Sequence, residues 1–259
     1  PLDVTSIVGC AVLTGAGAVM NTAKVRPGES VAVYGVGGVG LCAIQMASIL
    51  EAYPIVAVDL LDEKLEFSRN FANKIWNAAR FVFKANQKKT MDYSLITAPI
   101  VNHPEDKWIL SRLNQTIKTT NEAFNKLQIG EAQEKLWNFI WHEFCDWYIE
   151  LAKSRLMGED EDAKAAAQST IVWVLDQALR LLHPMMPFIT EEIWQNLLER
   201  LPREGDLPAS IMVAPYPQAN PGLQDSQAEA EISLVMQTIR AVRNTRAQLQ
   251  IPANKNLEA

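Results

Sequence analysis

The chain has 259 residues, of which 48% are hydrophobic and 21% charged, and its formal net charge is −6. This length predicts one large or two modest domains, and the composition excludes a fibrous, collagen-like or wholly disordered chain. The apolar runs fall short of the roughly 18 residues that span a bilayer, and no secretory signal stands at the start, so we expect no membrane association. An acidic total gives no general reason for nucleic-acid binding, which must rest on local chemistry.

Cysteine usage is typical of a reducing compartment. The chain has three cysteines, Cys10, Cys42 and Cys145, which are far apart and odd in number. They form neither a disulfide framework nor a paired metal-binding motif. We therefore expect a cytoplasmic chain with no metal site.

The first part of the chain is typical of an α/β unit. A Pro-Gly turn precedes a β-prone run at residues 30–34, and a second β-prone run follows at residues 54–58. A glycine-rich turn and a helix over about residues 39–50 lie between them, which predicts one β-α-β unit. A helix from residue 62 to about 84 keeps one face apolar, so we expect it to join the first part rigidly to the second.

The glycine-rich turn matches a dinucleotide-binding fingerprint. Gly35, Gly37 and Gly40 form G-x-G-x-x-G between the predicted strand and helix, and Asp59 lies 19 residues after Gly40. In such a turn the first glycine permits the tight bend, the second lets a pyrophosphate approach the backbone, and the third lets helix and strand pack closely. The helix N-terminus faces the phosphate, and Asp59 accepts hydrogen bonds from the ribose of NAD. The alternative is a glycine-rich turn kept for packing alone.

Residues 1–69 resemble part of the coenzyme domain of medium-chain, zinc-dependent alcohol dehydrogenases. The resemblance lies in two stretches, VGCAVLTGAGAVMNTAKVRPGESVAVYGVGGVGLCAIQMA and VDLLDEKLEFSR. It implies NAD as a cofactor, with Asp59 and Lys64 at the adenosine ribose, and it places Cys10 where that family has a catalytic zinc ligand. A catalytic zinc needs three protein ligands, and no Cys or His lies near Cys10 in sequence. We therefore expect Cys10 to be a small buried residue, and we expect no dehydrogenase activity.

The second part, which holds all seven tryptophans, is typical of a bundle of helices. Apolar residues recur at helical spacing in three stretches, at residues 108–127, 136–151 and 171–182. Prolines after His183 break the chain, and Thr190 with the two glutamates that follow it suits a new helix start. The tryptophans and Phe144 are expected in the core.

A proline-rich loop separates these helices from a last one. The loop runs over residues 201–222 and contains a short predicted strand at 210–213. Ser226 and Glu229 have capping-box spacing, and the helix that they open runs to about residue 250. Its apolar residues are expected on one face: Ile232, Val235, Met236, Ile239, Val242 and Leu249.

Residues 69–259 resemble the anticodon-binding region of valyl-tRNA synthetases. The motifs are RNFANKIWNAARFV, DKWILSRLNQTI, WHEFCDWYIELAK and LLHPMMPFITEEIWQ, and the final segment continues the match. The resemblance implies a tRNA anticodon loop as partner, where splayed bases stack on aromatic rings and pair with polar side chains. It implies that Asn77 reads a base edge, that Phe81 supplies a stacking face one turn away, and that Ile149 is an apolar position near the same loop. The alternatives are a core role for Phe81 and a surface role for Asn77.

Basic side chains occur in groups that are candidates for phosphate contact, with solvated surface as the alternative. The groups are Lys84, Lys88 and Lys89; Lys153 and Arg155; and Arg240, Arg243 and Arg246. His142, Cys145 and His183 are expected to pack rather than to bind a metal or catalyse.

The expected fold class is α plus α/β: a mostly α-helical anticodon-binding bundle preceded by a partial Rossmann β-α-β unit. We expect a partial dinucleotide-binding unit at 1–68, the anticodon-binding domain at 69–215, and a C-terminal helix leading to a truncated coiled-coil arm at 216–259. The HIGH and KMSKS signatures of the family's catalytic domain do not occur, so we expect a tRNA-binding module without catalytic residues. Two alternatives stay open, an NAD-dependent zinc alcohol dehydrogenase fragment and a non-functional fusion. Truncated apolar faces favour self-association.

Overall fold

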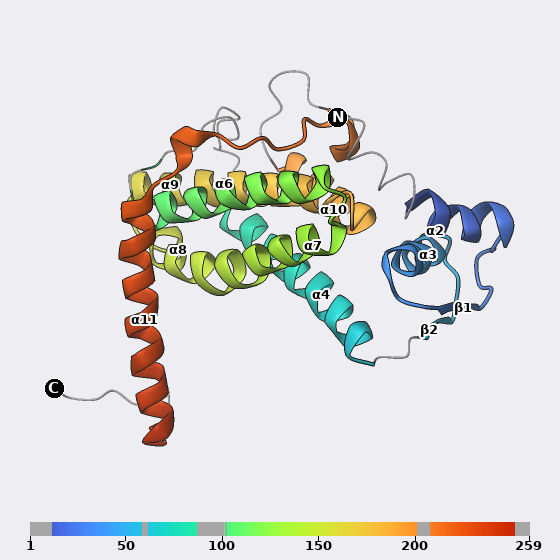
Figure 1. Cartoon of the computed structure of the whole chain (residues 1–259), viewed down its shortest axis with the longest axis horizontal. Helices are drawn as coiled ribbons and strands as arrows, with labels where there is room; N and C mark the ends of the chain where they lie inside the picture. Colours follow the sequence, from blue (N-terminus) through green and yellow to red (C-terminus); the bar gives the residue numbers. More distant parts are fainter. Residues whose placement is uncertain (1–11, 59–61, 87–100, 102, 201–207, 252–259) are drawn as a thin grey trace.

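A small α/β unit and a larger helical bundle make up the computed structural model (Figure 1), which describes residues 12–58, 62–86, 101, 103–200 and 208–251. The two parts have separate hydrophobic cores, and the larger core belongs to the bundle. None of the helices in the described ranges is long and apolar enough to cross a membrane. The expected fold class, a mostly helical bundle preceded by a β-α-β unit, is confirmed.

The α/β unit contains two parallel strands joined by a helix. Its elements are α2 (Leu13–Gly17), the π-helical turn η2 (Ala18–Thr22), β1 (Val31–Tyr34), α3 (Gly38–Ile49) and β2 (Ile55–Val58). The strands pair in register from Val31 opposite Ile55 to Tyr34 opposite Val58. These elements agree with the predicted strands and helix to within a residue or two.

The core of this unit is small. The buried cluster at its centre consists of Val19, Ala43, Ala47 and Ala52, of which three are alanines, and the larger side chains around this cluster are only partly buried. Val12, Ala16, Val36 and Cys42 of the unit are also buried. Tyr34 is 80% exposed, and burial alternates between half-buried and exposed along both strands. The unit therefore buries little apolar surface for its length.

Helix α4 (Asp62–Ala85) follows, as the apolar face from residue 62 to about 84 predicts. From Phe71 onward its buried side chains, Phe71, Ile75, Ala78, Ala79 and Val82, recur every three or four residues and join the bundle core. In Figure 1 the helix runs obliquely across the bundle, with its C-terminal end near α8 and α9. The opposite face of its C-terminal half is left to solvent.

The bundle proper follows α4 in chain order. Its elements are α6 (Pro104–Asn125), α7 (Ile129–Asn138), the π-helix η3 (Phe139–Tyr148), α8 (Ile149–Leu156), α9 (Glu161–Leu182), α10 (Pro187–Leu198), the 3₁₀ turns η4 (Ile211–Val213) and η5 (Pro221–Leu223), and α11 (Ser226–Gln248). Helix α9 contacts α4, α6, α8 and α10 and is the centre of the bundle. All the residues that the sequence places on its buried face are buried: Ile171, Val174, Leu175, Ala178 and Leu182.

Helices α7, η3 and α8 form one continuous helical stretch with a row of buried residues spaced four apart. The row comprises Leu136, Ile140, Phe144, Tyr148, Ala152 and Leu156; Ala132, Phe139 and Ile149 are also buried. An α-helix has 3.6 residues per turn, so a spacing of four drifts around its surface. The wider turns of the π-helix offset that drift and keep the six side chains on one face. Trp147 and Leu151, which have the spacing of an α-helix, are therefore only half-buried against the core, while Tyr148 and Ala152 are fully buried.

Two predicted element starts differ from the structure. Residues 211–213 form the 3₁₀ turn η4 instead of a strand, because they pair with their own turn and not with another strand. Helix α10 begins at Pro187 instead of Thr190. Proline suits the first helical position because its φ is already helical and because an amide N–H there would have no partner within the helix. Thr190 is buried, and its hydroxyl donates to the carbonyl of Met186.

The predicted capping box at Ser226 was wrong. Asp225 is the N-cap of α11, and its carboxylate accepts a hydrogen bond from the Ala228 amide at 2.9 Å. Glu229 turns instead to α6, where its carboxylate accepts a hydrogen bond from the Ser111 hydroxyl and lies 3.6 Å from Arg112.

Helix α11 packs on the bundle mainly through its first turns. Ala228 and Ile232 are buried, whereas Val242 and Leu249 are 53% and 64% exposed. In Figure 1 the helix continues beyond the bundle toward the C-terminus. The apolar face predicted from residue 232 to 249 is therefore only partly buried among the described residues.

The seven tryptophans differ in how deeply their side chains are buried. Trp108 and Trp194 are buried, as predicted, and so is Phe144. Four more, Trp137, Trp141, Trp147 and Trp173, are half-buried against the same core, while Trp76 is 36% exposed.

Candidate nucleic-acid interface

A groove lies along the solvent face of the C-terminal half of α4. Its volume is about 460 Å³, and it is lined by Asn77, Arg80, Phe81, Phe83, Lys84 and Arg200. Residues three or four apart on a helix share a face, which explains why Asn77, Arg80, Phe81 and Lys84 line it together. Arg200, which follows α10, closes the groove from a distant part of the chain.

Two aromatic rings in the groove are fixed from behind and covered by cations. Phe81 and Phe83 are half-buried and pack against the bundle core. The Lys153 ammonium lies 5.7 Å from the centroid of the Phe81 ring, and the Arg200 guanidinium lies 4.5 Å from that of Phe83. These separations are within the range of cation–π attraction. The rings are therefore held in place without being fully covered.

Three cations line the groove. Among the described residues, Arg80, Lys84 and Arg200 have no carboxylate within ion-pair distance, whereas Lys74 pairs with Asp146 and Arg112 with Glu143. All three are exposed. The groove is therefore a local basic site on a chain with a net charge of −6, which is the local chemistry that nucleic-acid binding requires here.

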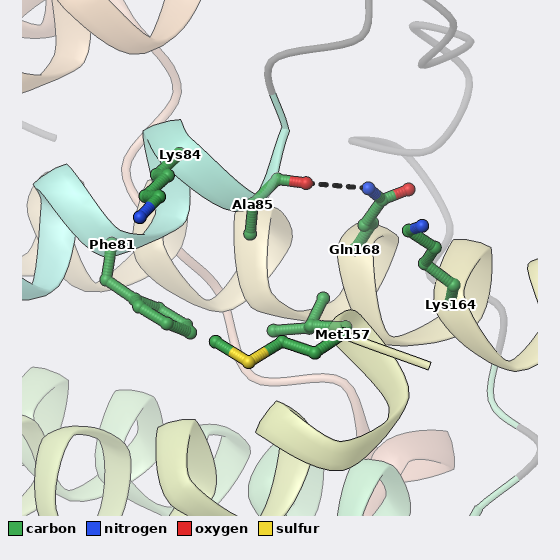
Figure 2. Close-up of a pocket in the computed structure, with 7 residues that line it drawn as sticks. Phe81, Lys84, Ala85, Met157, Lys164 and Gln168 are labelled. Carbon is green, nitrogen blue, oxygen red and sulfur yellow. Dashed lines mark hydrogen bonds between the residues drawn. The ribbon is translucent and has the colours of Figure 1, made fainter. Parts of the chain in front are cut away.

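A pocket of about 290 Å³ adjoins the groove at the end of α4 (Figure 2). It is lined by Phe81, Lys84 and Ala85 of α4, by Leu156 and Met157 at the end of α8, and by Lys164 and Gln168 of α9. The side-chain amide of Gln168 donates a hydrogen bond to the Ala85 carbonyl at 2.7 Å. This bond fixes the wall between α4 and α9.

The structure brings together two of the three residues that the resemblance implies. Asn77 is exposed in the groove, and Phe81 lines both the groove and the pocket. Ile149 of α8 is only 6% exposed, belongs to the bundle core and lines neither cavity. Lys153, one turn further along α8, covers the Phe81 ring, so that helix approaches the groove through its lysine and not its isoleucine.

Arg155 is not a surface phosphate ligand, which corrects its assignment to a basic surface group. Its guanidinium donates to both oxygens of the buried Asp106 carboxylate, at 2.8 and 2.7 Å, and lies 3.0 Å from Glu105. The Tyr148 hydroxyl donates to the same carboxylate at 2.7 Å. Burial, followed by the charge of Asp106, raises the pKa of Tyr148 well above its usual value. This network ties α8 to the first turn of α6.

The other basic groups fall in different places. Lys88 and Lys89 lie outside the described residues. The guanidinium groups of Arg240 and Arg243 lie 5.3 and 5.8 Å from the Trp147 ring, so α11 packs against η3 through cation–π contacts.

The glycine turn has the backbone form that the fingerprint predicts. Gly35 has φ +91°, and a Cβ added to Gly40 would lie 1.8 Å from the Gly35 carbonyl oxygen, so both positions require glycine. Gly37 caps α3 and faces open space. Cys10 and Asp59 lie outside the described residues, as does the side chain of Lys64.

The described part of this unit does not fit a complete NAD site. Dinucleotides bind in the crevice where strand order reverses in a larger parallel sheet, and the sheet described here has two strands, β1 and β2. The turn supplies a phosphate cradle but no second half to hold the nicotinamide. NAD binding by Gly35, Gly37, Gly40, Asp59 and Lys64 stays a prediction.

His183 and Cys145 are packed against the bundle, as predicted, whereas the side chain of His142 is 51% exposed and its Nδ1 lies 3.2 Å from Asp146. The His183 ring is buried, with Nδ1 2.8 Å from the Thr190 hydroxyl, and burial lowers its pKa. Burial raises the pKa of Cys145 to about 12, so its thiol stays protonated. Within the described ranges, no group of three or more His, Cys, Asp or Glu is arranged to hold a metal ion.

Comparisons with known proteins identify the family of the helical part of the chain. The family described as the anticodon-binding domain of tRNA ligase matches residues 106–259. The chain belongs to this family. Valine–tRNA ligase of Bacillus cereus is 48% identical over 196 residues, which cover 76% of this chain and 21% of that protein. The enzymes of Geobacillus stearothermophilus (48% over 193 residues) and Listeria innocua (46% over 195) match in the same way.

The chain spans about a fifth of the length of the curated relatives that it matches. The resemblance of its helical part to valyl-tRNA synthetases is confirmed. Because the family match begins at residue 106, the dehydrogenase resemblance of residues 1–69 stays a prediction. Among solved structures, a LeuRS–tRNA–LeuAMS ternary complex from Agrobacterium radiobacter is 15% identical with a TM-score of 0.46, covering 85% of this chain and 27% of that one.

Proposed function

We propose that the chain binds the anticodon loop of a tRNA through the groove on α4, with valine tRNA as its specific partner. The observation that carries the proposal is the groove itself, where an exposed amide and two anchored aromatic rings converge with three cations that have no acidic partner among the described residues. The choice of valine tRNA rests on the relatives, which are valine–tRNA ligases. We assign recognition to this chain, and no step of aminoacylation.

The chemistry of the groove suits a splayed single-stranded loop. Bases in such loops stack on aromatic rings, and their edges are free to pair with polar side chains. In this proposal Phe81 provides the stacking surface and the Asn77 amide, with both donor and acceptor atoms, reads a base edge. Arg80, Lys84 and Arg200 meet the phosphates on either side. An acidic protein can then bind RNA because its charge is locally reversed.

The test is a titration of the full chain with valine tRNA and with the same tRNA carrying a changed anticodon. We expect tighter binding to the native anticodon and a loss of about tenfold on Phe81→Ala, the usual size of one base–aromatic stacking contact. Phe124→Leu is the control, because it changes an aromatic residue of the buried cluster between α6 and α7, away from the groove. Equal affinity for the two tRNAs, or no effect of Phe81→Ala, would contradict the proposal.

A further inference from the structure

Helix α11 has a second apolar face, separate from the one that packs on the bundle. Ala228, Ile232 and Met236 contact the bundle core near the start of the helix. Residues that alternate three and four apart share one side of a helix, and a row with this spacing lies on another side of α11. The row comprises Val235, Thr238, Val242, Thr245 and Leu249, and Leu234 and Ala241 flank it.

This second row is open to solvent. Leu234, Val242 and Leu249 are 66%, 53% and 64% exposed. None of the five row positions carries a charge. The Thr238 hydroxyl donates to the Leu234 carbonyl within the helix at 2.9 Å, so it needs no outside partner and leaves the methyl group of Thr238 available for packing. A continuous apolar row on an exposed helix face is typical of a protein–protein contact.

The spacing of the row suits a second helix. Apolar positions that alternate three and four apart repeat every seven residues, which is the pattern of two helices that wind around each other. From Val235 to Leu249 the row covers two such repeats, about 20 Å of helix at 1.5 Å per residue. The bundle holds another side of α11 through α6, so the helix is ordered before a partner arrives.

Charge is distributed unevenly along α11. Its carboxylates lie at the beginning, and its guanidinium groups lie in the second half. The residues are Asp225, Glu229 and Glu231, then Arg240, Arg243 and Arg246. Two copies of α11 that run in opposite directions place the acidic beginning of each beside the basic second half of the other, whereas copies that run in the same direction place like charges together. The charges therefore favour an antiparallel pair.

A lipid surface fits this helix less well than a second copy does. An interfacial helix carries lysines and arginines on the polar face beside its apolar side and is attracted to anionic lipids. Glu231 stands four residues before Val235, on the same side of α11 as the row, and an anionic surface would repel it. In an antiparallel pair the same carboxylate lies toward the basic half of the partner helix.

We propose that the second apolar row of α11 is a contact between two copies of this chain, whose α11 helices pair in antiparallel orientation. Figure 1 shows α11 continuing beyond the bundle, so this arrangement places the two bundles at opposite ends of the helix pair. No residue of α11 lines the groove on α4, so the contact is separate from the proposed RNA site and does not depend on it. A contact of two repeats is small beside the 2,000 Å² or more, roughly, of obligate dimers, so the dimer should dissociate on dilution.

The test is sedimentation equilibrium of the full chain over a range of concentrations. Val242→Glu and Leu249→Glu place a carboxylate in the middle and at the end of the row. Asn244→Glu is the matched control, because it makes the same change of charge at an exposed position of α11 outside the row. All three positions are exposed, so the variants should fold, which circular dichroism checks.

We expect the wild-type chain to dimerise as its concentration rises. Val242→Glu and Leu249→Glu should each raise the dissociation constant by about tenfold or more, because an aliphatic contact is replaced by a charge that loses its water. Asn244→Glu should dimerise as the wild type does.

The orientation is tested by mixing two variants, Val235→Lys and Leu249→Glu. With Val242 at the centre of an antiparallel pair, Val235 of each copy lies near Leu249 of the other. The new lysine of one variant then meets the new glutamate of the other, so the mixture should dimerise more tightly than either variant alone. In a parallel pair, the rescuing mixture would instead be Leu249→Lys with Leu249→Glu.

Three results would overturn the proposal. A wild-type chain that stays monomeric at the highest concentration reached would mean that something other than a second copy covers the row. Dimers that Val242→Glu and Leu249→Glu leave as stable as the wild type would place the contact elsewhere on the chain. Rescue by the two Leu249 variants, and not by Val235→Lys with Leu249→Glu, would show that the helices pair in parallel.

Discussion

The Nε2 amide of Gln168 donates a hydrogen bond to the carbonyl oxygen of Ala85 at 2.7 Å, which joins α9 to the last residue of α4. Carbonyls in the last turn of a helix have no partner within the helix. A second carbonyl of this last turn, that of Val82, accepts a hydrogen bond at 2.7 Å from the side-chain amide of Asn86. These two bonds hold the helix end that carries Phe81 and Lys84.

Gln168→Leu should lower both stability and RNA affinity. The loss of one neutral hydrogen bond costs about 1 kcal/mol, which for a chain of this size lowers Tm by roughly 2–4 °C. The freed end of α4 should also weaken loop binding a few-fold, because Phe81 and Lys84 are no longer fixed. Gln115→Leu, an exposed position on α6, is the matched control and should change neither quantity. A Tm loss with unchanged affinity would show that this bond has no part in shaping the site.

Asp106→Ala should be among the most destabilising single changes in the bundle. Asp106 is fully buried and its carboxylate receives hydrogen bonds from Arg155 and Tyr148. Removing one partner of a buried ion pair leaves an uncompensated charge and costs about 3–5 kcal/mol. Tyr148→Phe removes only one hydrogen bond to a charged group and should cost about 1.5–3 kcal/mol.

Urea unfolding measures both losses. Glu150→Ala is the control, because the exposed pair that Glu150 makes with Lys153 contributes at most about 1 kcal/mol. A loss for Asp106→Ala no larger than the loss for Glu150→Ala would mean that the network does not hold α8 against α6.

The helices were predictable from residue spacing, because burial in a bundle follows the helical period. Ile171, Val174 and Leu175 show this for α9, and the strands around the glycine turn were equally clear. The prediction failed where the helix does not have the assumed period of 3.6 residues per turn. Spacing of 3.6 residues selects Trp147 for the buried face, but η3 has wider turns and buries Tyr148. Nothing in the residue types between 139 and 148 signals this change.

The candidate site was predictable only where it lies on one helix. Asn77 and Phe81 are four residues apart and matched a family motif, so the sequence indicated them. Arg200, which follows α10, and Met157, which follows α8, join the same site, and no local pattern links residues so far apart. Arg155 shows the opposite error, a residue wrongly assigned to the surface. The sequence suggests an exposed cation, but its guanidinium forms an ion pair with Asp106 on α6.

Stability of the bundle should fall as the pH drops below about 6.5, in part through His183. Burial lowers the pKa of His183 in the folded state, although the nearby charge of Glu191 opposes this shift. Between the unfolded-state value of about 6.5 and the lower folded-state value, the unfolded chain binds a proton that the folded chain does not. The stabilisation is therefore fully present above pH 6.5 and is lost as the pH falls toward the folded-state pKa.

His183→Gln should flatten this dependence when Tm is measured from pH 7.5 to 5.5. His142→Gln, which changes a histidine with a 51% exposed side chain that lies 3.2 Å from Asp146, is the control and should not flatten the dependence. The assignment to His183 is wrong if its variant loses stability toward low pH as steeply as the wild type does.

The α/β unit should open more readily than the bundle. The buried cluster at its centre consists of Val19 and three alanines, and larger side chains such as Met46 are only partly buried against it, while the bundle fully buries Trp194, Tyr148 and Phe139. Local opening free energy follows the apolar surface that a segment buries. Hydrogen exchange should show weaker protection in residues 30–58 than in residues 106–200. Stronger protection in the first range would contradict this ranking.

The salt dependence of RNA binding should separate the free cations of the groove from the paired ones. A phosphate contact to single-stranded RNA adds about 0.7 to the slope of log affinity against log salt concentration. We expect the slope to fall by about this amount in each of three variants, Arg80→Ala, Lys84→Ala and Arg200→Ala. The fall should be the same for native and altered anticodons, because phosphates carry no sequence information.

Lys135→Ala is the matched control for this series. Lys135 is a cation whose side chain is 33% exposed, and it pairs with Glu131 at 2.6 Å on α7, so its removal should leave the slope unchanged. Asn77→Ala should behave in the opposite way to the cations, with reduced discrimination between anticodons and an unaltered salt slope. If Lys135→Ala lowers the slope as much as Lys84→Ala does, the RNA responds to the overall charge of the protein and the groove is not its binding site.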